Sequence, residues 1–105
     1  MISITLYQNQ NGEVYRFKVL NHGKSVVCAG VSALVITCVN FIQAQFLELD
    51  VTQKHNENGG YIDFEINSDL NKEINLAIAQ MVFGLEQIRQ SNKREVRIQT
   101  KTRKE

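Results

Sequence analysis

The residues best suited to chemistry are Cys28 and His22, which lie six positions apart. Cys28 opens a long uncharged run of helical character, and unpaired N–H groups and the helix dipole favour a thiolate at such a position. Histidine is the usual general base for a cysteine nucleophile. A tight turn through Gly23 would bring the imidazole beside the sulfur. We therefore expect Cys28 to act as nucleophile and His22 as general base and acid.

Two neighbours of Cys28 are candidates for supporting roles. Ser32 follows one helical turn later. Its hydroxyl either donates to a thiolate or substrate, or bonds back to the Cys28 carbonyl, and the sequence leaves both possibilities open. The backbone N–H groups of Cys28 and Ala29 are candidates for an oxyanion hole. The competing interpretation of Cys28 is a small, inert core residue.

Hydrophobic periodicity predicts one α+β domain, residues 1–105, with elements in the order β-β-α-β-β-α-β. We expect a mixed sheet with two helices packed on it, and a tight first hairpin at Asn11-Gly12. Residues 101–105 are expected to fray. The expected strands are Met1–Gln8, Val14–Leu20, Leu47–Thr52, Tyr61–Ile66 and Val96–Thr100. The expected helices run from Val27 to Leu47, and from a cap at Ser68 or Asp69 through Ile88.

Charge and ligand spacing limit the possible partners. With 12 basic and 11 acidic residues the net charge is +1, which argues against a nucleic-acid partner. We interpret the C-terminal basic cluster as a solvated face, with contact to RNA or an acidic surface as the alternative. Its members are Lys93, Arg94, Arg97, Lys101, Arg103 and Lys104. His22, His55 and the two cysteines lack ligand-type spacing, so neither a metal nor a cofactor is expected.

The cysteines and the apolar run indicate the compartment. Cys28 and Cys38 are ten residues apart in one expected helix, about 15 Å along its axis, which is too far for a disulfide. With no secretory signal, we expect a reduced cytoplasmic protein. The uncharged run from Ser25 to Leu47 is long enough to span a membrane, but amides crowd one end and no aromatic or basic belt flanks it. We therefore expect a helix buried on most sides and no membrane partner.

Three segments of the chain carry a family signature. These segments are Val26-Val27-Cys28-Ala29-Gly30-Val31-Ser32-Ala33-Leu34, Val39-Asn40 and Asn58-Gly59-Gly60. In them the chain resembles the ribosomal-processing cysteine proteases. These are small bacterial enzymes that remove an N-terminal extension from a large-subunit ribosomal protein. Length and element order agree over nearly the whole chain. The resemblance implies a cysteine endopeptidase, a ribosomal protein substrate with an N-terminal extension, and a homodimer.

The chain departs from the family between His22 and Cys28. Asn21 stands where the family usually has glycine, Gly23 where it has alanine and Ser25 where it has aspartate, and most of a glycine-rich loop is missing. A short link leaves little to close over a substrate. Two alternatives therefore stay open: a non-catalytic ribosome-associated binding module, and a purely structural dimerisation domain.

Overall fold

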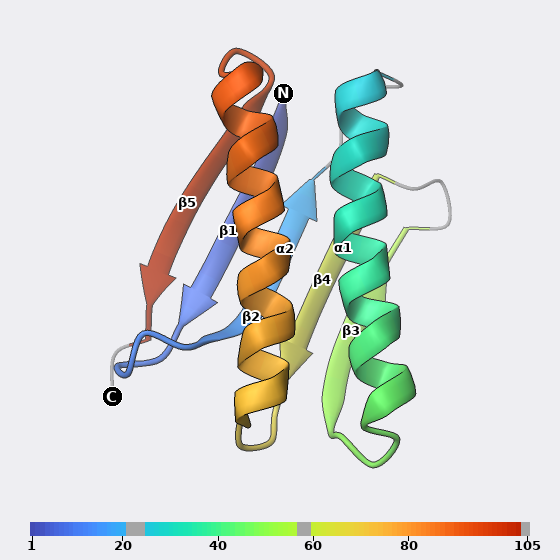
Figure 1. The fold of residues 1–105 in the computed structure, drawn as a ribbon, viewed down its shortest axis with the longest axis vertical. Coiled ribbons are helices and arrows are strands. Elements are labelled where there is room, and N and C mark those ends of the chain that lie inside the picture. Colours follow the sequence, from blue (N-terminus) through green and yellow to red (C-terminus); the bar gives the residue numbers. More distant parts are fainter. Residues whose placement is uncertain (21–24, 57–59, 104–105) are drawn as a thin grey trace.

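A computed structural model describes residues 1–20, 25–56 and 60–103 (Figure 1). Five strands and two helices follow the predicted order β-β-α-β-β-α-β. The strands are β1 (Ile2–Gln8), β2 (Val14–Leu20), β3 (Val51–His55), β4 (Tyr61–Ile66) and β5 (Val96–Thr102), and the helices are α1 (Val26–Gln45) and α2 (Lys72–Ser91). The predicted α+β class is therefore confirmed.

The five strands form one mixed sheet in the order β3-β4-β2-β1-β5. All neighbouring pairs are antiparallel except β1 and β5, which run parallel. The crossover through α2 connects β4 to β5, so that β5 runs in the same direction as β4 and β1. Both helices lie on the same face of the sheet, antiparallel to each other, with α2 in front of β1 and β2 and α1 in front of β4 and β3 (Figure 1). No helix in the described chain covers the opposite face.

The first hairpin has the predicted turn. Gly12 has φ 80, a left-handed conformation that glycine adopts without a Cβ clash. Asn9 stabilises the turn through three hydrogen bonds. Its backbone carbonyl accepts from Gly12 N–H, and its side-chain oxygen accepts from the N–H groups of Asn11 and Glu13. A bulge between Tyr7 and Gln8 absorbs the extra residue.

The core lies between the sheet and the helices, because alternate strand residues point toward them. Phe17 and Phe64 are register partners on β2 and β4, fully buried, with ring centroids 5.4 Å apart. The buried residues of α2 belong to the same core, and they are Ile74, Ile78, Met81 and Leu85. This four-residue stripe follows the helical period that the sequence predicted.

Several boundaries differ from those predicted. The strand expected at Leu47–Thr52 begins only at Val51, because Phe46 and Leu49 close the end of α1 through bonds to Ile42 and Phe46. The expected cap at Ser68 or Asp69 was wrong: Asn71 caps α2, accepting from Ile74 N–H at 2.7 Å. The end of the chain is also more ordered than expected. Residues 101 and 102 belong to β5, pairing with Tyr7 and Gln8.

α1 is less enclosed than expected. Its length and composition would let it cross a membrane, yet here it packs on the sheet and α2 along one side. Its buried residues are Cys28, Val31, Val35, Cys38, Val39 and Ile42. The opposite side presents apolar side chains outward, among them Phe41 at 51% exposure. The prediction of a helix buried on most sides was therefore wrong.

Candidate active site

Cys28 lies in the first turn of α1, as predicted. Ser25 is the N-cap residue, with extended backbone, and its hydroxyl oxygen accepts a hydrogen bond from Cys28 N–H at 3.1 Å. Serine is one of the preferred N-cap residues, so Ser25 suits this position. The Cys28 side chain is 8% exposed, at the edge of the core. The cap therefore fixes the helix start that holds the thiol.

The backbone donors near Cys28 differ from those predicted. Cys28 N–H donates to the Ser25 hydroxyl, and Ala29 N–H donates to the Ser25 carbonyl at 3.1 Å. Neither amide is open to a substrate oxygen, so the expected oxyanion hole from this pair does not form in this arrangement. The first-turn N–H groups without an acceptor among the described residues are those of Val26 and Val27.

His22 and Ser32 remain predictions as site residues. His22 belongs to residues 21–24, which lie outside the described chain, so its pairing with Cys28 is untested. Ser32 lies on α1 one turn after Cys28, half-buried, and is engaged in a polar interaction. Both of the roles considered for its hydroxyl therefore stay open. The turn predicted at Asn58-Gly59-Gly60 also falls mostly outside the described residues.

Gly30 belongs to the family block and lies where the two helices approach. A Cβ placed on Gly30 would meet the Ile88 side chain at 3.4 Å, an ordinary van der Waals contact. The N-terminal half of α1 therefore packs closely against the C-terminal end of α2.

Cys38, the second thiol, is a core residue. It is 6% exposed, and its sulfur lies 3.8 Å from the carbonyl oxygen of Ala77 on α2. Burial raises the pKa of this thiol to about 11, because a thiolate there would lose its hydration. Cys38 is therefore a weak nucleophile at neutral pH.

We expect native-state alkylation to distinguish the two cysteines. At pH 8 only about one Cys38 in a thousand carries a thiolate, given its pKa of about 11. Iodoacetamide should therefore modify Cys28 and leave Cys38 intact until the protein is denatured. Peptide mass mapping after a timed pulse measures this. Equal labelling of both thiols in the folded protein would contradict the assignment.

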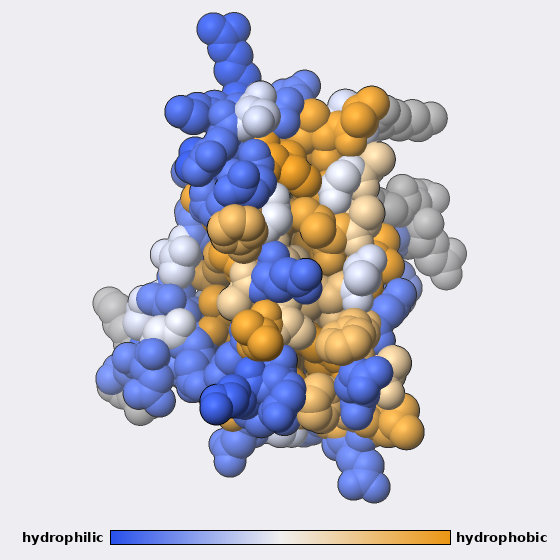
Figure 2. All heavy atoms as spheres, viewed as in Figure 1, coloured by the Kyte–Doolittle hydropathy of each residue, from blue (hydrophilic) through white to orange (hydrophobic). Residues whose placement is uncertain are grey.

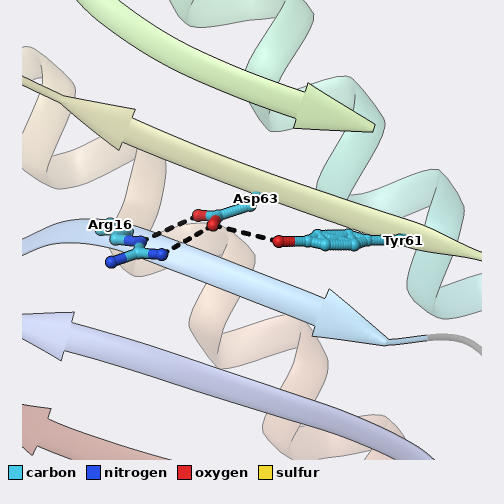
Figure 3. Close-up of polar contacts among 3 residues, drawn as sticks. All are labelled: Arg16, Tyr61 and Asp63. Atoms are coloured by element: carbon cyan, nitrogen blue, oxygen red, sulfur yellow. Dashed lines mark hydrogen bonds and ion pairs between the residues drawn. The ribbon is translucent and has the colours of Figure 1, made fainter. Parts of the chain in front are cut away.

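A polar network on the open face of the sheet was not predicted (Figure 3). Arg16 on β2 makes two hydrogen bonds to Asp63 on β4, at 2.7 and 2.9 Å, and the Tyr61 hydroxyl donates to Asp63 at 3.3 Å. The Arg16 guanidinium holds the pKa of Asp63 below its ordinary value. The alternation places each residue on this face, but only the strand register brings them together. Among the described residues no cluster fit to hold a metal ion is found.

Comparisons with known proteins agree with these features. The family model for cysteine protease Prp matches residues 1–97. The Bacillus subtilis (strain 168) ribosomal processing cysteine protease Prp is 32% identical over 113 residues, covering 95% of this chain and 97% of that protein. The crystal structure of the S. aureus ribosomal processing protease Prp with a covalently linked product peptide aligns with TM-score 0.85 and 25% identity, covering 96% of this chain and 100% of that one. An S. aureus Prp complex with a substrate peptide aligns with TM-score 0.83, at 22% identity over the same shares. The chain therefore belongs to the Prp family of cysteine proteases.

Proposed function

We propose that this protein is the cysteine endopeptidase that removes the N-terminal extension of a large-subunit ribosomal protein, in support of ribosome assembly. The observation that carries the proposal is the capped first turn of α1, which holds Cys28 at the start of the helix, within the residues that the cysteine protease family model matches. The relative from Bacillus subtilis is a ribosomal processing protease, and the S. aureus protein binds substrate and product peptides. We place the reaction in the reducing cytoplasm, where a catalytic thiol stays reduced.

The proposed reaction is a two-step acyl transfer. His22 takes the proton of the Cys28 thiol, and the sulfur attacks the scissile carbonyl to form a tetrahedral oxyanion. Collapse breaks the C–N bond, and His22 returns the proton to the leaving amine. Water then attacks the thioester and regenerates the thiol, releasing the other peptide as a carboxylic acid. Each step uses groups of this chain and water alone.

The oxyanion would be held by the first turn of α1. Val26 and Val27 supply N–H groups that no described residue accepts, whereas the amides of Cys28 and Ala29 are already engaged. Donors fixed by the helix need no reorientation when charge develops on the substrate oxygen. The positive end of the helix dipole adds to the same effect. Ser25 contributes by holding this turn in place.

Incubation of the purified protein with the extended ribosomal protein of the same organism tests the proposal. We expect one new N-terminus, at the junction of extension and mature protein, read by mass spectrometry. The control is the same ribosomal protein without its extension, which should stay intact. An uncleaved substrate that nevertheless co-purifies with the protein would instead support the non-catalytic binding module.

We also propose that the protein forms a homodimer through the outer face of its helices. Apolar side chains gather over α1 and over the seam between the helices (Figure 2). A groove of about 880 Å³ runs along this seam, with Phe41 and Leu76 among its lining residues. Phe41 is 51% exposed and Leu76 is 72% exposed. A second copy would bury this surface, and α1 has no charged residue that would oppose the contact.

The dimer proposal predicts a localised effect of charge. Phe41→Lys combined with Leu76→Lys should convert a dimer to a monomer, because a lysine in the buried centre of an interface loses its hydration. Sedimentation velocity measures the change. Phe83→Lys is the matched control: Phe83 is exposed on α2 but lines a separate groove beside the first hairpin. A wild type that sediments as a monomer, or equal dissociation by the control, would refute the assignment.

A further inference from the structure

The face of the sheet opposite the helices is open and unusually basic. Strand register aligns its side chains in rows that cross the sheet. One row is Lys101, Tyr7, Arg16, Glu65 and Thr52, the next is Gln99, Thr5, Lys18, Asp63 and Lys54, and the third is Arg97, Ser3, Leu20 and Tyr61. These rows hold five basic and two acidic residues, a net charge of +3, although the chain as a whole carries only +1.

Apart from Arg16, the cations in these rows form no ion pair with a described residue. Among the described residues, ion pairs form only between Arg16 and Asp63 and between Arg89 and Glu86. The remaining basic side chains on the open face form no ion pair, although Lys18 helps to lower the pKa of Asp63, its register partner. They are Lys18, Lys54, Arg97 and Lys101. They span the sheet from β5 to β3, about 19 Å for four strand spacings. Like charges gathered on one face repel each other unless a polyanion binds there.

Aromatic rings lie among these cations. Arg16 packs over the Tyr7 ring at 4.5 Å from its centroid, and Lys101 lies 6.0 Å from the same centroid. Tyr61 extends over the open face toward Asp63 (Figure 3), and its register partner Leu20 is partly exposed. Arginine guanidinium groups and tyrosine rings stack on nucleobases, whereas the carboxylates of an acidic peptide do not stack on aromatic rings.

We propose that the open face of the sheet binds single-stranded RNA. A flat sheet offers no element to enter a duplex groove, whereas unpaired bases lie readily on exposed rings with their phosphates near lysine and arginine. The site is separate from the active site, because Cys28 lies on the helical side of the sheet. Through it, the protein would contact RNA while the other side engages the peptide.

Fluorescence anisotropy with a labelled oligouridine tests the proposal. We expect wild-type binding that weakens linearly in log Kd against log salt. Arg97→Gln with Lys101→Gln should weaken binding about tenfold and reduce the salt slope by about 1.4, since each single-strand phosphate contact contributes about 0.7. Tyr7→Leu should weaken binding with an unchanged slope, because a stacked base carries no counterion.

Lys72→Gln with Arg89→Gln is the matched control, removing one lysine and one arginine from α2. It should retain wild-type affinity for the oligouridine. Absent wild-type binding at low salt, or an equal loss in both double variants, would overturn the proposal. So would an oligoglutamate of equal charge that competes as tightly as the RNA, since it would identify an acidic-peptide site. Cleavage by the Arg97→Gln, Lys101→Gln variant should be unchanged, which separates this test from that of the protease activity.

Discussion

Cys28→Ala should abolish cleavage of the extended ribosomal protein, lowering the rate by at least about 10⁴-fold, because no other group can form the thioester. His22→Ala should cause a loss of similar order, since the two residues act as one unit and their effects are not additive. The measurement is single-turnover cleavage followed by mass spectrometry. It also tests whether the shortened link between His22 and Cys28 permits catalysis.

Cys38→Ala is the control for that experiment. Cys38 is buried against α2 with its pKa raised to about 11, so its removal should leave the cleavage chemistry intact and affect mainly stability. Loss of activity in Cys38→Ala with a normal thermal transition would contradict the assignment of Cys28 as sole nucleophile. Activity that persists in Cys28→Ala would overturn it outright.

Asp63→Ala should lower the free energy of unfolding by about 2 kcal/mol, because it leaves the Arg16 guanidinium partly buried without its two hydrogen bonds. Asp63 is nearly enclosed, with 6% of its side chain exposed, and Arg16 is 28% exposed. Urea unfolding measures the loss. The control is Glu86→Ala. The N–O distance of its ion pair with Arg89 is similar, 2.9 Å, but these side chains are 38% and 33% exposed. That change should cost less than about 0.5 kcal/mol.

The Asp63 contribution should also depend on pH in a defined direction. Its folded-state pKa is lowered, chiefly by the hydrogen bonds from Arg16, so the unfolded state binds its proton first as the pH falls. The stabilisation is therefore fully present above the unfolded carboxyl pKa near 4 and disappears as the pH drops through the folded value. The difference between wild type and Asp63→Ala should be constant above about pH 5 and shrink below about pH 4. A difference that instead grows on acidification would refute this linkage.

The element order was predictable because each segment carries its own period. Alternation in β1 and β2, the Asn11-Gly12 turn and the apolar stripe of α2 are local signals, and all three correspond to elements of the structure. Boundaries were less predictable where two local signals competed. Leu47 and Leu49 continue the alternation into β3, yet backbone bonds after α1 hold them in a turn. Ser68, Asp69 and Asn71 are all acceptable caps, and the chain geometry selects Asn71.

In the candidate site, too, some features were predictable from the sequence and others only from the structure. Residue type and neighbours in the sequence predicted Cys28 as the reactive thiol, and this stays a prediction, whereas the structure shows that Cys38 is a core residue. The hydrogen-bond partners of Ser25 decided which first-turn amides remain open, and these are Val26 and Val27. The sequence analysis did not predict an N-cap residue for α1. It considered Ser25 only as the residue that replaces the family's aspartate. The role of His22 remains a prediction.

The sequence by itself indicated the class of protein through its resemblance to the family, because the block from Val26 to Leu34 that carries this resemblance consists of adjacent residues. Only the tertiary structure decided where the charge lies. Net charge argued against RNA, but pairing β1 with both β2 and β5 gathers cations from residues 16 to 101 on one face. The pairing of β2 with β4 places Arg16 beside Asp63, 47 positions away. Register is a long-range property of the sheet, set by which strands pair, and no local pattern contains it.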